Sequence, residues 1–145
     1  MIFEPRYSGY EDRVRQSLCD QPLMSVIFGA VASSVAPGLV EIKVDVRSEM
    51  LQPRGNVHGV IASAVADSAA GYAAQTLIAE DADIVTVEYK INFLAPGIGS
   101  KIRGIGKVLR PGRTLFVCSA DVYAEDDKNS ILFAHMVTTM MSVPV

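Results

Sequence analysis

Residues 55–74 read GNVHGVIASAVADSAAGYAA, and this stretch constrains the fold more than any other part of the chain. It is rich in alanine and lacks the alternation of β-branched residues typical of a strand, so we expect a helix from about His58 to Leu77. Nearly the whole circumference of that helix is apolar, which predicts burial on most sides. One carboxylate, Asp67, nevertheless lies near its middle, where burial without a partner costs several kcal/mol.

The segments around this helix have the patterns of strands and one short helix. Leu39–Val46 alternates as LVEIKVDV and, with residues 26–35 and the turn Pro37-Gly38, predicts a hairpin. A short amphipathic helix is expected over residues 9–20. Turn sequences divide four further expected strands, at 84–94, 99–109, 113–124 and 130–143. This order predicts an α+β fold, with an antiparallel sheet curled around one central helix.

The length and hydrophobicity of the chain indicate one domain that assembles with copies of itself. Its 145 residues suit a single domain, expected over 1–145, with residues 1–22 as an N-terminal helical segment. Half of the residues are hydrophobic and the mean hydropathy is +0.28. A lone small domain needs less apolar surface, so the surplus predicts a homo-oligomer.

Charge and segment composition argue against several classes of partner. The net charge of −3 and the pI near 5.3 give no basic field to attract nucleic acid. The longest apolar run, residues 22–38, is too short to cross a bilayer, and the charged N-terminus is unlike a secretion signal. Cys19 and Cys118 match no metal or redox spacing and are expected to be buried thiols in a reducing compartment. These features predict a cytoplasmic protein without nucleic-acid or membrane partners.

Two polar side chains of the predicted helix lie too far apart to work together within one chain. His58 and Asp67 are nine residues apart. At roughly 100° per residue they point to opposite sides of the helix, about 13 Å apart along its axis. If both serve one active site, they come from different subunits.

Each of these residues has two interpretations. Asp67 is either a structural carboxylate, satisfied by backbone N–H or hydroxyl groups of a neighbouring strand, or a general base or nucleophile. His58 at a helix start often makes only a local hydrogen bond. No second histidine, cysteine or acid sits at metal-ligand spacing from either residue, so no metal is expected.

Gly59 is the third residue of interest, because it falls in the first turn of the predicted helix. Asn56 is expected to be the N-cap. Backbone N–H groups in a first turn lack intrahelical partners, and a glycine there lets a substrate approach them, as in an oxyanion site. Alternatively, Gly59 only permits close packing of the helix against a strand. The residues alone leave both interpretations open.

Five stretches of the chain recur in one known family in this order and spacing. They are His58-Gly59, the acid in VADSAAGYAA, VTVEYKINFLAPG at 85–97, RPGRTLFVCSADVY at 110–123 and the strand ending AHMVTTMM. Together they closely resemble the PaaI-like thioesterases of the hotdog-fold superfamily, from about residue 20 to the C-terminus. The resemblance implies a hotdog fold, in which two protomers join their sheets into one continuous sheet and such dimers often pair into tetramers. It also implies hydrolysis of an acyl-CoA thioester at the dimer interface, without a cofactor, since coenzyme A is part of the substrate.

The resemblance also assigns roles to single residues. Asp67 matches the catalytic acid, a general base or nucleophile, and Gly59 matches the glycine whose N–H polarises the thioester carbonyl. His58 matches a histidine that orients groups beside that glycine. Thr86 falls where some members place a hydroxyl that positions water, and Gln52 falls where the family has Asn or Gln near the thioester.

Two positions depart from the family pattern. Val60 replaces the second glycine of the usual His-Gly-Gly and is expected to narrow the pocket or shift the acyl group. Gly71 stands where some branches carry a hydroxyl one turn after the acid, which leaves more of the water positioning to Thr86.

The remaining expected contacts are with the two ends of the substrate. Arg110 and Arg113 flank the Pro111-Gly112 turn, where family members approach the CoA phosphates, and Thr114 adds a hydroxyl or backbone contact. The other basic residues of this region are expected to form a solvated strand face: Lys101, Arg103 and Lys107. At the acyl end, three residues are expected to line the site: Asn56, Val60 and Phe93. Val60, Phe93 and the alanine-rich helix predict an apolar pocket suited to phenylacetyl, hydroxybenzoyl or medium-chain acyl groups.

Two alternatives share the fold but not the reaction. One is a non-catalytic acyl-CoA-binding hotdog domain, which Val60 leaves open. The other is a hotdog dehydratase or hydratase, which ranks lower because its HFP-type segment is absent from the sequence.

Overall fold

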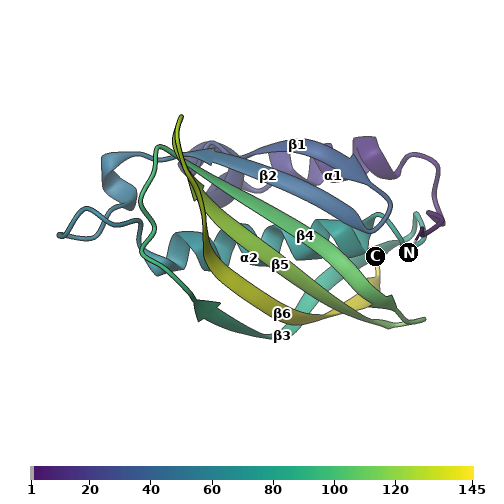
Figure 1. Ribbon diagram of the computed structural model, residues 1–145. Coiled ribbons are helices and arrows are strands. Elements are labelled where there is room, and N and C mark those ends of the chain that lie inside the picture. Colours follow the sequence, from purple (N-terminus) through teal and green to yellow (C-terminus); the bar gives the residue numbers. More distant parts are fainter. Residues whose placement is uncertain (1) are drawn as a thin grey trace.

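A computed structural model describes residues 2–145 and contains a six-stranded antiparallel sheet wrapped around one long helix (Figure 1). The sheet order is β1-β2-β4-β5-β6-β3. The helices and short helical turns are α1 (Tyr10–Cys19), the π-helix η1 (Leu23–Ile27), the 3-10 helix η2 (Ser48–Met50) and the central α2 (Gly59–Gln75). The strands are β1 (Val31–Ala36), β2 (Leu39–Asp45), β3 (Ala82–Phe93), β4 (Lys101–Pro111), β5 (Leu115–Glu125) and β6 (Ser130–Pro144).

This architecture confirms the predicted α+β fold, the central helix and the four C-terminal strands. The first predicted strand is wrong at its start, because residues 23–27 are helical and β1 begins only at Val31. The Ser25 hydroxyl donates to the carbonyls of Cys19 and Gln21, so it continues the turn after α1 instead of joining the sheet. Gly29, with φ of +61°, then redirects the chain into β1. Of the predicted N-terminal segment 1–22, Met1 lies outside the described residues.

The central helix packs closely on β4 because the strand carries glycines at the contact. A Cβ on Gly106 would overlap the backbone of Ala69, and one on Gly104 would overlap the Val65 side chain. Val65, Ala69 and Ala70 are fully buried there. The small residues therefore let the helix backbone approach the sheet closely, which a larger residue on either side prevents.

Helix α1 covers the far end of α2 and satisfies its last carbonyls. Both terminal nitrogens of Arg13 donate to that end, Nη2 to the Gln75 carbonyl and Nη1 to the Ala79 carbonyl, each at 2.8 Å. Carbonyls at a helix C-terminus lack intrahelical donors and carry negative partial charge, so a guanidinium stabilises them. The apolar side of α1, Val14 and Leu18, is buried in the core as predicted.

Strand β3 forms one edge of the sheet and pairs only with β6 among the described strands. Its twelve residues are mostly exposed, including the hydrophobic side chains of Val85, Val87 and Tyr89. A long apolar edge strand presents unpaired backbone groups to another chain. The homo-oligomer expected from the composition remains a prediction.

Two further sequence expectations concern the thiols and the membrane. Cys118 is buried as expected, but Cys19 is exposed, because it closes α1 on the side away from the core. None of the helices over residues 2–145 is long and apolar enough to span a bilayer.

We predict opposite effects of alanine at two glycines that contact the core. Gly106→Ala places a methyl group into the Ala69 backbone and should lower the free energy of unfolding by about 1–3 kcal/mol. Gly71→Ala, whose Cβ would lie 3.7 Å from Met140, should raise it by about 0.5–1 kcal/mol through helix propensity. Urea denaturation measures both. Equal effects would contradict the close helix–sheet contact at Gly106.

Candidate active site

The start of α2 leaves one backbone N–H free. His58, not the predicted Asn56, is the N-cap, and its Nδ1 accepts from the Val60 N–H at 3.1 Å. Asn56 lies two residues before the cap, in a loop where its carbonyl accepts from the Gln52 N–H. The Ile61 N–H donates to the His58 carbonyl. The Gly59 N–H has no acceptor among residues 2–145. It therefore points its positive end out of the helix, as the oxyanion interpretation requires.

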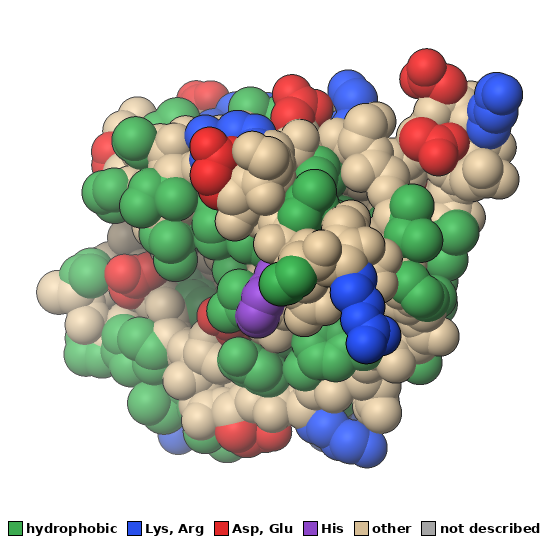
Figure 2. Space-filling view, turned by 90° about the vertical axis from the view of Figure 1, so that its left-hand side faces the viewer, with side chains coloured by type: hydrophobic (Ala, Val, Ile, Leu, Met, Phe, Trp, Pro, Cys, Tyr) green, Lys and Arg blue, Asp and Glu red, His purple; other side chains and the backbone are tan. Residues whose placement is uncertain are grey.

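The loop before α2 is held rigidly and brings Gln52 beside the helix start. Leu51 and Val57 form an isolated antiparallel bridge, and the His58 N–H donates to the Met50 carbonyl. Gly55 closes the loop with φ of +86°. Figure 2 views the molecule from this end and shows hydrophobic side chains spread over much of it. Several exposed ones belong to this region: Leu51, Val60, Phe93, Leu94 and Ile98.

Phe93, which is expected to line the site, packs against Gly59. A Cβ on Gly59 would lie 2.9 Å from the Phe93 ring. The ring is half exposed and lies 6.0 Å from the Phe133 ring, centroid to centroid. Gly59 thus permits a close contact as well as leaving its N–H free. Val60 is 58% exposed, so in one chain it lies on the surface beside Gly59.

Asp67 and Thr86 form the one hydrogen-bonded pair among the predicted catalytic residues. The Thr86 hydroxyl donates to Asp67 Oδ1 at 2.8 Å across the space between α2 and β3. Partial burial raises the pKa of the Asp67 carboxyl above its ordinary value, and the Thr86 hydrogen bond opposes that rise. A carboxyl with a raised pKa and one specific hydroxyl partner is typical of a general base.

A β-bulge in β3 lets Thr86 and Phe93 point to the same side of the sheet. They are seven residues apart, so strict alternation would place them on opposite faces. The pairing of β3 with β6 shifts register between Thr86 and Glu88, where one extra residue is inserted. One strand therefore supplies both the partner of Asp67 and the ring beside Gly59.

The structure does not bring the two halves of the predicted site together within one chain. Asp67 lies eight residues beyond Gly59 in a continuous helix, or about 12 Å along its axis. The carbonyl group of one thioester therefore cannot lie within hydrogen-bond distance of both Asp67 and the Gly59 N–H. The separation inferred from the sequence thus holds in the folded chain.

A cavity of about 350 Å³ opens beside Asp67 and Thr86. It is separate from the apolar pocket expected from the sequence, because the side chains that line it from α1, α2 and β3 are mainly polar and include neither Val60 nor Phe93. Among these, Tyr72 and Gln75 were missed by the sequence reasoning, although they lie five and eight residues after Asp67 on one side of the helix. Residues 2–145 contain no cluster of histidine, cysteine or acidic side chains arranged to hold a metal ion.

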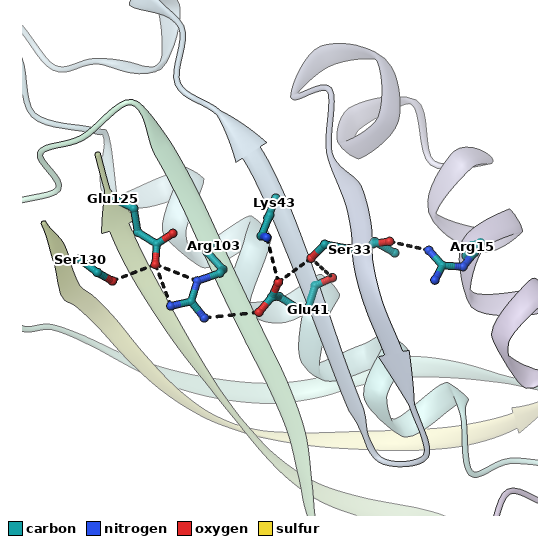
Figure 3. Close-up of polar contacts among 8 residues, drawn as sticks. Arg15, Ser33, Glu41, Lys43, Arg103, Glu125 and Ser130 are labelled. Atoms are coloured by element: carbon teal, nitrogen blue, oxygen red, sulfur yellow. Dashed lines mark hydrogen bonds and ion pairs between the residues drawn. The ribbon is translucent and has the colours of Figure 1, made fainter. Parts of the chain in front are cut away.

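The basic residues of β4 divide as expected into strand-face residues and residues of the turn. Arg103 bonds to Glu125 through Nε at 2.8 Å and to Glu41 through Nη1 at 3.4 Å, in the polar network of Figure 3. Its guanidinium also stacks over Tyr123, 4.7 Å from the ring centroid. Lys101 lies 3.6 Å from Asp45. Lys101 and Lys107 are exposed on the strand, as expected of a solvated face, whereas Arg103 is only partly exposed within its ion-pair network.

Arg110, Arg113 and Thr114 lie at the opposite end of α2 from Gly59. The end of β4 joins the C-terminus of α2 through Gly38, whose carbonyl accepts from Val108 and whose N–H donates to Thr76. The turn is therefore remote from the helix start in the same chain. A role for these residues beside Gly59 needs a second chain.

Comparison with known proteins identifies the family. The sequence profile of the thioesterase superfamily matches residues 54–131, more than half of the chain. The chain belongs to the thioesterase superfamily. A thioesterase family protein from Silicibacter pomeroyi is 39% identical, with 94% of this chain and 100% of that chain covered and a TM-score of 0.91. The predicted hotdog fold and the class of thioester hydrolase are thereby confirmed at the level of this family.

Two solved structures with lower sequence identity share the fold, and a further relative matches by sequence over part of its length. A thioesterase from Haemophilus influenzae is 19% identical over 98% of this chain and 96% of that chain, with a TM-score of 0.83. A phenylacetic acid degradation-related protein from Ralstonia eutropha is 22% identical over 91% and 98%, with a TM-score of 0.76. A candidate esterase from Saccharolobus solfataricus is 34% identical over 91 residues, which are 63% of this chain and span 64% of that protein's length.

We predict that Thr86 holds down the pKa of Asp67. Thr86→Val removes the donor while keeping the shape, so the pKa of Asp67 should rise further, because burial then acts unopposed. Thr86→Ser keeps the donor and serves as the control. Titration of the carboxyl carbon by NMR in both variants measures the difference. An unchanged pKa in Thr86→Val would show that the hydrogen bond does not tune the acid.

Proposed function

We propose that the protein is an acyl-CoA thioesterase, which hydrolyses an acyl-CoA to the free acid and coenzyme A without a cofactor. The observation that supports this most is the Asp67–Thr86 pair on the wall of a cavity. Family membership gives the reaction class, and the pair supplies a carboxylate that can activate the attack on the thioester.

In this proposal Asp67 activates the attack on the thioester carbonyl. Thr86 occupies Oδ1, so Oδ2 is the oxygen that accepts a proton from water as it attacks, or that attacks the carbonyl itself. In the first route water adds to the carbonyl, the C–S bond breaks, and the proton held by Asp67 passes to the CoA thiolate. In the second route the C–S bond breaks to leave a mixed anhydride on Asp67, and water hydrolyses this anhydride to the free acid while one of its protons goes to the CoA thiolate. The raised pKa strengthens Asp67 as a base.

Gly59 stabilises the oxyanion that forms in this step. Its free N–H and the positive end of α2 are suited to a developing negative charge on the carbonyl oxygen. His58 holds the neighbouring Val60 N–H and fixes the helix start. Gln52, in the adjoining loop, is placed to contact the thioester.

The complete site forms between two subunits. Asp67 and Gly59 of one helix are too far apart for one carbonyl, so each site takes the acid from one subunit and the N–H from the other. The exposed edge of β3, with Val85 and Tyr89, is suited to extend the sheet into the partner. In such a dimer Arg110 and Arg113, with Thr114, are assigned to the CoA phosphates. A dimer of dimers and a cytoplasmic location complete the proposal.

We predict that Asp67→Asn abolishes thioester hydrolysis without destabilising the protein. Thiol release from short, medium, long and aromatic acyl-CoAs should fall by about 10²–10⁴-fold in kcat. The folded-state pKa of Asp67 lies above its ordinary value of 3.8, so stability from the protonated form is lost as pH rises through that pKa. At neutral pH the variant should therefore match or exceed the wild-type Tm.

Asp45→Asn is the control, since Asp45 lies exposed on the outer face of β2. An active Asp67→Asn enzyme would remove Asp67 from the chemistry. If wild type binds CoA but releases thiol from no member of the panel, the protein is a binding module.

We predict that Gly59→Pro loses activity and Gly59→Ala largely retains it. Both variants place a Cβ against Phe93, but only proline removes the N–H. Proline is tolerated at the first helical position, and His58 has the extended ψ of 136° that proline requires before it. The loss in kcat should be about 10²–10³-fold for proline. Similar losses in both variants would attribute the effect to packing.

Gly59→Pro tests the two-subunit site when it is combined in one dimer with an Asp67→Asn subunit. In a mixed dimer one site carries both defects and the other carries neither, so about half of the wild-type activity per dimer should return. Differently tagged subunits, co-expressed and purified through both tags, allow the measurement. No recovery would place the whole site within one chain.

A further inference from the structure

The Thr86 hydroxyl has two acceptors and only one hydrogen to donate. Its oxygen lies 2.8 Å from Asp67 Oδ1 on α2 and 3.4 Å from Met140 Sδ on β6. A hydroxyl donates one hydrogen bond, so the carboxylate and the thioether compete for the same hydrogen. The ionised carboxylate is the stronger acceptor and the sulfur the weaker one. Any share that the sulfur takes weakens the hydrogen bond to Asp67.

The fold holds the sulfur of Met140 beside this hydroxyl. Thr86 and Met140 are opposite one another in the ladder between β3 and β6, and Phe116 of β5 is opposite Met140 on its other side. Met140 is fully buried. Its terminal methyl carbon lies 3.7 Å from where a Cβ on Gly71 would be, so the missing side chain on α2 leaves room for it. Contacts with three elements thus restrict a side chain that is otherwise flexible.

The competition for the hydrogen matters when Asp67 changes its charge. Burial raises the pKa of Asp67, and the Thr86 hydrogen bond to the ionised carboxylate opposes that rise. In the proposed reaction Oδ2 accepts a proton from water, and Oδ1 then becomes a neutral and weaker acceptor. The Thr86 hydrogen can turn toward the Met140 sulfur at that stage, and no covalent bond breaks. The sulfur therefore favours the protonated acid over the ionised one.

The other titratable groups beside Asp67 belong to other elements than β6. Three line the same cavity: Asp20 at the end of α1, Tyr72 on α2 and Asp83 on β3. Among the described residues, β6 adds no titratable side chain to this lining. A substitution at Met140 therefore reaches Asp67 either through the Thr86 hydroxyl or through packing, and experiment can separate these two routes.

We infer that Met140 is a positioning residue for the proposed hydrolysis, because its sulfur shares the Thr86 hydrogen with Asp67 and leaves the carboxylate a stronger base. This rests on the proposed thioesterase function of the same site. Leucine in place of Met140 keeps nearly the same volume, which cores tolerate well, but accepts no hydrogen bond. Thr86 then donates to Asp67 alone.

Met140→Leu should lower the pKa of Asp67, measured by NMR titration of its carboxyl carbon. The acid limb of the pH profile of kcat/KM, measured by thiol release from acyl-CoA on the assembled protein, should move to lower pH with it. At a fixed pH on that limb, the share of the plateau kcat/KM that remains should rise about two- to threefold. Met140→Ile is a second apolar replacement and should shift both measurements in the same direction.

Met136→Leu is the matched control. Met136 is fully buried on the same face of β6, and its neighbours across the two ladders are the apolar Ile91 and Ala120. Its sulfur therefore has no hydroxyl opposite it. This variant should keep the wild-type pKa of Asp67 and the wild-type acid limb.

Repeating Met140→Leu in a Thr86→Val background separates the two routes. If the sulfur acts through the hydroxyl, the substitution leaves the pKa of Asp67 unchanged there, because no hydrogen remains to be shared. A packing effect shifts the pKa equally in both backgrounds. Equal shifts, or no shift when Thr86 is present, would overturn the inference.

The titration keeps this inference distinct from the proposed function. An unchanged pKa of Asp67 in Met140→Leu, with thiol release by the wild type, refutes the role of Met140 and leaves the thioesterase intact. A lowered pKa without movement of the acid limb also refutes that role, because the contact then tunes the acid without affecting the reaction. No thiol release from any acyl-CoA by the wild type refutes the thioesterase and the inference with it.

Discussion

The close contact between α2 and β4 determines where every other part of the site lies. Gly104 and Gly106 carry no side chains, so the helix backbone at Val65 and Ala69 rests almost directly on the strand. Asp67 lies midway between those two residues in sequence and, at about 100° per residue, on roughly the opposite side of the helix from both. The packing that buries one side of α2 therefore presents Asp67 to β3 and α1. The fold and the site depend on the same small residues.

The surroundings of Asp67 favour the catalytic interpretation over the structural one. A structural carboxylate within a core is typically held by several donors, often backbone N–H groups. Within residues 2–145 Asp67 accepts one hydrogen bond, from the Thr86 hydroxyl, and it borders a cavity. Burial raises its pKa and one hydroxyl opposes the rise. This arrangement leaves part of the carboxylate available to a reactant, at a cost in stability that a purely structural residue has no reason to carry.

The sequence predicted the features that depend on local pattern and missed those that depend on tertiary contact. Periodicity and turn residues located α2 and four strands, because burial imposes both patterns. Asn56 was a reasonable N-cap by composition, but the loop engages its carbonyl and the His58 ring supplies the acceptor. Gln75 shares the helix face of Asp67, yet only the docking of α1, with Ser17 at its amide, shows that it lines a cavity.

The bulge in β3 is the feature that pattern analysis is least able to supply. The period of two would assign Thr86 and Phe93 to opposite faces, and only the inserted residue near Val87 turns both toward α2. The same strand is the open edge of the sheet, so a partner that extends the sheet would lie beside both residues. One irregular strand, β3, thus determines three features. They are the contact of Thr86 with Asp67, the place of the Phe93 ring beside Gly59, and the open edge for a second subunit. Removing the bulge would turn either Thr86 or Phe93 away from α2, so it would disrupt one half of the site whichever way the register moved.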